Sequence, residues 1–102
     1  MDAVAAIFHD EIRVWHNVTD RTVDKRAGLA VMRWYVATVT ARNYDVLERR
    51  HWPGGMMQRH VLHGRLGDVE LRAPVCITFE FRDGQIIAIH EYVDSAAMMP
   101  SS

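Results

Sequence analysis

A single carboxylate interrupts the apolar face of a strand near the end of the chain. Within residues 85–94, alternate positions carry Ile87, Ile89, Glu91 and Val93. Successive strand residues point to opposite faces, so Glu91 shares its face with these aliphatic side chains. If that face lines a pocket, Glu91 loses hydration, which makes a carboxylate a better proton acceptor. The alternative is a surface glutamate that pairs with an arginine across the sheet.

Two further segments carry polar side chains that could take part in chemistry. In the first, Trp15 and Asn17 share one face of a strand and His16 lies on the other. Trp15 can equally be a core residue, and Asn17 can cap the turn that follows. In the second, His60 could act as an acid or base, or could donate a hydrogen bond to a negatively charged oxygen. The alternative is that His60 and its neighbour Arg59 are half-solvated strand residues.

The composition limits the classes of function. The six histidines form no H-x-x-x-H pair, and His60 and His63 fall on opposite faces of a strand, so we expect no metal and no other cofactor. The net charge of −1 gives no electrostatic footprint for nucleic acid, and no apolar stretch has the length of a membrane span. Cys76 is the only cysteine, which excludes an internal disulfide, and we expect the protein in the cytoplasm.

Helical periodicity is confined to the first half of the chain. The 102 residues fit one domain, which we place at residues 1–95, with a flexible tail at residues 96–102. A short helix is predicted up to about His9, and a strand follows at residues 12–17. Asp24 is a suitable N-cap for the main helix, residues 25–39. The face expected to pack on a sheet consists of Ala27, Ala30, Val31, Trp34 and Thr38.

From Asn43 onward the hydrophobic period changes to two, which is typical of strands. We expect a bulge or bend at Pro74, because proline lacks a backbone N–H for the ladder. Helices followed by a run of strands indicate an α+β fold with a curved antiparallel sheet of at least four strands. The predicted strands are residues 44–52, 56–63, 69–81 and 85–94, joined by turns at residues 53–55, 64–68 and Asp83-Gly84.

Two stretches of the chain carry a family resemblance. The first is residues 7–17, Ile-Phe-His-Asp-Glu-Ile-Arg-Val-Trp-His-Asn, and the second is residues 79–86, Phe-Glu-Phe-Arg-Asp-Gly-Gln-Ile, followed by Glu-Tyr-Val-Asp at 91–94. They resemble the short helix entering the first strand and the closing hairpin of the NTF2-like superfamily. SnoaL-like polyketide cyclases, ketosteroid isomerases and limonene epoxide hydrolases share its cone-shaped fold. The family usually begins with a long helix that closes the narrow end of the cone, whereas this sequence starts at what resembles the second, shorter helix. Either the pocket is more open, or a partner subunit covers the apolar surface left exposed, and we expect a homodimer.

The resemblance also implies roles for individual residues. Glu91 matches the position of an aspartate that activates water in the epoxide hydrolases. Asn17 matches an asparagine that helps to hold this water, and Trp15 stands where those enzymes have a tyrosine. Their arginine–aspartate pair corresponds to Gln58 and His60, or after a one-residue shift to Arg59 and Val61, so neither register reproduces it.

The predicted function follows from this comparison. We expect a SnoaL-like protein that binds a hydrophobic small molecule, such as a polyketide-, terpenoid- or steroid-like compound. As an enzyme it would carry out cofactor-independent acid–base chemistry of the cyclase, isomerase or epoxide hydrolase type, with Glu91, His60 and Arg59 as catalytic residues. The alternative is a non-catalytic ligand-binding or dimerisation module of the same fold. The residues expected to contact the ligand are Trp15, Asn17, Trp34, Tyr35 and Phe79.

Overall fold

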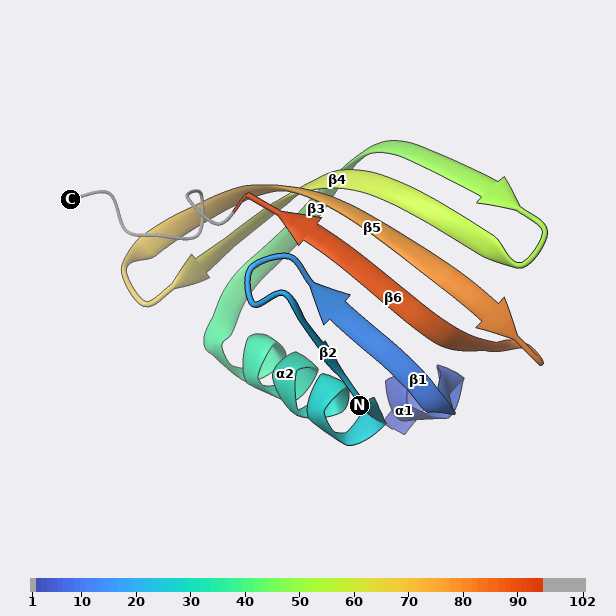
Figure 1. The fold of residues 1–102 in the computed structure, drawn as a ribbon. Helices are drawn as coiled ribbons and strands as arrows, with labels where there is room; N and C mark the ends of the chain where they lie inside the picture. Colours follow the sequence, from blue (N-terminus) through green and yellow to red (C-terminus); the bar gives the residue numbers. More distant parts are fainter. Residues whose placement is uncertain (1, 95–102) are drawn as a thin grey trace.

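The computed structural model describes residues 2–94 and has the predicted α+β architecture, with a curved sheet arching over a helix (Figure 1). No helix within these residues is both long enough and apolar enough to cross a membrane. The predicted tail at 96–102 lies outside the described residues. The elements are α1 (Asp2–Ile7), β1 (Phe8–His16), β2 (Arg21–Val23), α2 (Lys25–Thr38), β3 (Val39–Trp52), β4 (Gly55–Leu66), β5 (Val69–Arg82) and β6 (Gln85–Val93).

The sheet has the strand order β2-β1-β6-β5-β4-β3. The last four strands form the predicted antiparallel meander, and Asp83-Gly84 closes the β5–β6 hairpin with both residues at positive φ. β1, in contrast, pairs with β6 in parallel, in a register that places His16 beside Glu91. The curved antiparallel sheet of at least four strands is therefore confirmed, with one parallel pair added. This pair makes the last strand an interior strand of the sheet.

Two predicted features of the strands are wrong. The turn expected at residues 64–68 is only Gly67-Asp68, because β4 continues to Leu66 in unbroken register with β5. Of the bulge or bend expected at Pro74, the bulge is absent, because the register with β4 is regular there. The irregularity of the β5–β6 pair lies at Glu80 and Phe81, opposite the extra β6 residue Ile87. The Pro74 carbonyl accepts a bond from the Asp94 backbone N–H (3.2 Å), so the proline nitrogen faces the point where β6 ends and no ladder donor is missed there.

The helix α2 begins as predicted but packs through a different face. The Asp24 carboxylate accepts a hydrogen bond from the Ala27 N–H (3.0 Å), which caps the helix. Its buried residues are Gly28 and Leu29, whereas Trp34 is 58% exposed. A Cβ at Gly28 would lie 3.1 Å from a Val14 methyl group, so this glycine allows close contact with β1. The predicted face of Ala27, Ala30, Val31, Trp34 and Thr38 is thus wrong, because Gly28 and Leu29 permit closer packing than those positions do.

The core divides into two clusters along the concave side of the sheet. One joins β1, β6 and α2 through Val14, Leu29 and Ile89. The other lies on β4 and β5 and contains Leu62 and Ala73, with α2 contributing at its margin. Helix α2 therefore spans both clusters and holds the concave side of the sheet, which is the side that positions the polar residues described below.

The start of β3 passes so close to β4 that only glycine fits. A Cβ at Gly64 would lie 2.7 Å from Cγ1 of Val39, which is 1% exposed. Replacing a glycine in a strand by alanine normally raises the free energy of unfolding by about 0.5–1 kcal/mol. Here we expect Gly64→Ala to lower the free energy of unfolding by about 1–3 kcal/mol, because the β-branched Val39 cannot rotate away. Urea unfolding measures the change.

The matched background for this test is Val39→Ala, which removes the methyl group in question. In that background Gly64→Ala should cost markedly less than in the wild type, because the clash is gone. An equal cost in both backgrounds would show that the close contact is not what requires glycine.

Candidate functional site

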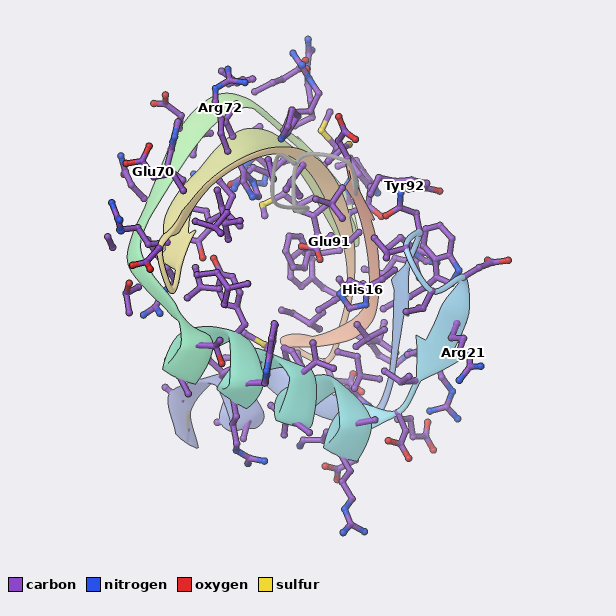
Figure 2. The ribbon with its side chains drawn as sticks, turned by 90° about the vertical axis from the view of Figure 1, so that its left-hand side faces the viewer. His16, Arg21, Glu70, Arg72, Glu91 and Tyr92 are labelled. Atoms are coloured by element: carbon purple, nitrogen blue, oxygen red, sulfur yellow. The ribbon has the colours of Figure 1, made fainter. Side chains whose placement is uncertain are left out.

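The inner face of the sheet, which looks toward α2, carries Glu91 and His60. Cross-strand partners share a face, and Ile77 opposite Glu91 and Val75 opposite His60 both pack in the core clusters on the helix side. Figure 2 shows the Glu91 side chain directed into the interior and Tyr92, its neighbour, directed away from it. The predicted alternation on β6 therefore holds for Ile89, Glu91 and Val93, but not back to Ile87, which is the extra residue at the irregularity with β5, while Ile86 packs on the core cluster. Glu91 lies near Ile77 and Ile89.

Glu91 is paired with His16, a residue that the sequence interpretation assigned to the other face. His16 Nε2 lies 3.0 Å from Glu91 Oε1, and both side chains point inward (Figure 2). The His16 and Glu91 side chains are 28% and 29% exposed, so the interior is not filled at this point. The signal for His16 was the apolar alternation of Ile12 and Val14, which continues to position 16. This alternation alone does not predict the contact with Glu91, because the contact also requires the parallel pairing of β1 with β6.

His60 lies on β4, two strands from Glu91 on the same inner face of the sheet, and is only 7% exposed. Its Nδ1 is 2.9 Å from the side-chain nitrogen of Gln58, whose oxygen accepts two bonds from the Arg49 guanidinium (2.6 and 2.9 Å). Burial lowers the pKa of His60, and the negative charge of Glu91 opposes this effect in part. The imidazole therefore stays neutral to a lower pH than an ordinary histidine does.

Two tyrosine hydroxyls complete the polar groups of the interior. The Tyr35 and Tyr44 hydroxyls lie 2.9 Å apart, and the Tyr44 ring meets the His60 ring edge-on at 5.4 Å. Burial, the bond to Tyr44 and the charge of Glu91 raise the pKa of Tyr35, so its hydroxyl stays protonated. Glu91 thus acts electrostatically on both His60 and Tyr35, which places all three around one space.

Arg59 does not reach this interior, and the catalytic role predicted for it has no geometric basis. It is the outward neighbour of His60, and its Nε donates to Glu48 at 2.7 Å. Arg50 bonds the same carboxylate, and the two guanidinium groups lower the pKa of Glu48. Strand alternation decides the matter: His60 faces inward, so Arg59 must face outward.

Trp15 is likewise an outer-face residue. Its ring contacts Tyr92 at 4.9 Å and its indole N–H donates to Asp20 at 3.0 Å. Trp15 cannot line the interior, because the inward position beside it belongs to His16.

Of the other residues predicted to contact the ligand, two lie at the inner face and two do not. Asn17 is committed to the backbone of β6: its side chain donates to the Val93 carbonyl and accepts from the Val93 N–H, both at 3.0 Å. Trp34 points outward because the helix is rotated from the expected face. Tyr35 and the half-buried Phe79 remain at the inner face.

A cavity of about 290 Å³ lies near the end of β6. Its lining combines Arg59, Cys76 and Tyr92 of the outer face with the inner-face residues His60 and Val75. It therefore reaches His60, but Glu91 is not part of its lining.

The inner groups fit proton transfer better than metal chemistry. Within residues 2–94, no three His, Cys, Asp or Glu side chains gather closely enough to hold a metal ion. A carboxylate and neutral N–H or O–H donors around one space are the groups required to take up a proton and to stabilise the negative charge that results.

Similar proteins are found by structure and not by sequence. No protein-family model matches the chain, and no curated protein matches it. A SnoaL-like polyketide cyclase from Jannaschia sp. CCS1 aligns with a TM-score of 0.83 at 15% identity, over 96% of this chain and 74% of that chain. An LEH-like epoxide hydrolase from M. tuberculosis aligns with a TM-score of 0.76 at 20% identity, over 95% and 72%. A protein with a ketosteroid isomerase-like fold from Catenulispora acidiphila, in complex with trimethylamine, gives a TM-score of 0.79 at 10% identity, over 94% and 76%.

The likeness identifies the architecture. The chain has the NTF2-like fold, as the resemblance of its closing hairpin predicts. At such low identity the likeness carries the fold and no particular activity.

The lowered pKa of His60 predicts a pH dependence of stability. The unfolded state binds a proton near pH 6.5 and the native state only at lower pH, so the contribution of His60 is lost as pH falls below about 6.5. We expect the free energy of unfolding of the wild type to fall between pH 7.5 and pH 5.5 relative to that of His60→Gln. Urea titrations of both proteins at the two pH values measure this difference. An identical difference at both values would contradict it.

Proposed function

We propose that this chain binds a largely apolar small molecule between the inner face of the sheet and α2, and moves a proton on it without a cofactor. The observation that carries the proposal is the Glu91–His16 pair on an otherwise aliphatic strand face, 3.0 Å apart and still accessible. An accessible carboxylate among apolar walls combines a proton acceptor with a surface suited to a hydrophobic ligand. The expected compartment remains the cytoplasm.

Each inner group has a role in this reaction. Glu91 takes a proton from a carbon next to a carbonyl group, and the bonding electrons move to the carbonyl oxygen. His16 donates to Glu91 and orients it. His60 and the Tyr35–Tyr44 pair lie near enough to Glu91 to stabilise the oxygen that becomes negative. Return of the proton at another carbon gives an isomerisation, and attack of the carbanion on a second carbonyl gives a cyclisation.

The similar structures support the class of ligand. The neighbours named as a polyketide cyclase and an epoxide hydrolase indicate polyketide-, terpenoid- or steroid-like compounds. Water activation of the epoxide hydrolase type is less well supported, because His60 and Gln58 stand where the resemblance requires an aspartate and an arginine. The alternative from another class is a binding module that holds such a ligand and leaves it unchanged.

Glu91→Gln tests the role of the carboxylate. The assay is incorporation of deuterium from D2O into the α-positions of a panel of polycyclic ketones, followed by mass spectrometry. Because the variant keeps the volume and removes the base, we expect exchange to fall about 10²–10⁴-fold. Glu48→Gln is the matched control, because Glu48 is bound to Arg59 and Arg50 on the outer face, and it should exchange like the wild type.

The outcomes of this assay separate the two classes of function. Exchange that survives in Glu91→Gln would remove Glu91 from the mechanism. Binding of the ketones by native mass spectrometry without any exchange in the wild type would favour the non-catalytic module.

We also propose that the chain forms a homodimer through its convex face. Leu47 and Tyr92, which are 59% and 50% exposed, border the cavity near the end of β6 together with Pro74 and Cys76. Exposed apolar side chains gathered around a hollow are typical of an association site.

Leu47→Glu should therefore shift the protein from dimer to monomer in sedimentation velocity at micromolar concentration. A buried charge without a partner opposes association. Val18→Glu makes the same change at an equally exposed position in the β1–β2 turn and should leave the dimer intact. A wild-type monomer at high micromolar concentration would contradict the proposal.

A further inference from the structure

The side chain of Gln58 is fixed in one orientation by Arg49. A guanidinium group has only donors, and both Nε and Nη2 of Arg49 point at the same Gln58 atom, at 2.9 and 2.6 Å. That atom must be the amide oxygen, because the amide NH2 would set donors against donors. The other end of the amide, its NH2 group, therefore faces His60 Nδ1 at 2.9 Å.

This orientation decides which nitrogen of His60 carries the proton. An NH2 group donates, so Nδ1 must accept, and the proton of the neutral imidazole is on Nε2. Within residues 2–94 Nε2 has no hydrogen-bond partner, and no fully buried side-chain nitrogen or oxygen there is without one, so Nε2 keeps some exposure although His60 as a whole is only 7% exposed. Nε2 is an N–H donor with nothing bound to it. His60 also lines the cavity near the end of β6.

We propose that Arg49 and Gln58 are positioning residues that lock His60 as the neutral Nε2–H tautomer, so that the interior presents a donor to a substrate carbonyl oxygen. The inference rests on the proposed function for the identity of the reaction, and it adds the substrate class. A neutral donor suits an uncharged carbonyl compound whose oxygen becomes negative after Glu91 removes a proton. It does not suit a substrate that must be protonated by an imidazolium.

The surroundings of His60 agree with a neutral ring. On β5 its partner is the apolar Val75, and on β3 the Tyr44 ring packs against it edge-on. The charged group that acts on it from β6 is Glu91, whose effect is smaller than that of burial. A second proton on Nδ1 would also face the NH2 group of Gln58, and relief would require the amide to turn and lose both bonds to Arg49.

The tautomer can be read directly by NMR without any substrate. Two-bond ¹H–¹⁵N correlation spectra of ¹⁵N-histidine-labelled protein distinguish Nε2–H from Nδ1–H, and His60→Gln identifies the signal by its loss. We expect the wild type at pH 7.5 to show the Nε2–H pattern. In Gln58→Glu the carboxylate accepts from Nδ1, so the pattern should change to Nδ1–H or to the imidazolium, and the pH of half-titration should rise.

The Arg49 variants separate positioning from a general structural effect. Arg49→Lys keeps a cationic donor for the Gln58 oxygen and should retain the Nε2–H pattern. Arg49→Met frees the amide to turn and should give a mixture of tautomers. Circular dichroism establishes that each variant is folded, and the wild-type spectrum tests the inference even if a variant is not. A wild-type Nδ1–H pattern, or an unchanged pattern in Gln58→Glu, would overturn it.

Activity then distinguishes failure of this inference from failure of the proposed function. Loss of one donor to a developing oxyanion costs about 10²–10³-fold. The Nδ1–H tautomer of Gln58→Glu has no donor at Nε2 and should lower α-deuterium exchange by that factor, whereas an imidazolium keeps the Nε2–H. Arg49→Lys should exchange like the wild type. Exchange at the wild-type rate in a Gln58→Glu protein that shows the Nδ1–H pattern would refute the donor role of His60. If the wild type shows a clear Nε2–H pattern but no exchange, the proposed reaction is refuted. The inference that Arg49 and Gln58 fix the tautomer of His60 is then still supported.

Discussion

The parallel pairing of β1 with β6 is the constraint on which the rest of the molecule depends. It joins the first strand of the chain to the last and turns β6 from an edge into an interior strand. Val14 and Ile89 are thereby brought together under α2, and Gly28 lets the helix approach them closely. The same register sets His16 beside Glu91. One long-range pairing thus builds the main core cluster and the polar pair of the interior at once, so stability and site geometry are coupled.

The inner and outer faces of the sheet divide the polar residues into two sets with different physics. Outward carboxylates such as Glu48 are paired with arginines in contact with water, where ion pairs contribute about 0–1 kcal/mol. Inward groups face aliphatic neighbours, and burial lowers the pKa of His60 while the charge of Glu91 acts against this shift. Glu91 and His60 therefore influence one another across the interior, while Arg59, next to His60 in sequence, is electrically part of the surface.

Arg49 shows how an exposed residue can still act on the interior. Its guanidinium has only donors, so the Gln58 atom that it contacts must be the amide oxygen. The amide NH2 of Gln58 therefore faces Nδ1 of His60 and leaves the ring proton on Nε2. The ring is then a neutral donor on the same face of the sheet as the Glu91 carboxylate. Proton transfer without a cofactor requires at least a base and a hydrogen-bond donor, held at separate positions on rigid strands. The fold itself, shared with proteins of several activities, does not choose among the possible substrates.

Local sequence patterns determined much of this protein. The alternation in residues 69–81, the Asp83-Gly84 hairpin and the Asp24 cap depend on neighbours a few residues away, and the structure has all three. The alternation on β6 also placed Glu91 on the apolar face. Tertiary structure alone decided which face of α2 packs, because Ala27 to Thr38 is apolar on nearly every side and the choice of Leu29 over Trp34 follows from the close approach at Gly28. It also decided that His16 meets Glu91, since that contact depends on a register with a strand at the other end of the chain, whereas the alternation of Ile12 and Val14 indicates only the face on which His16 lies.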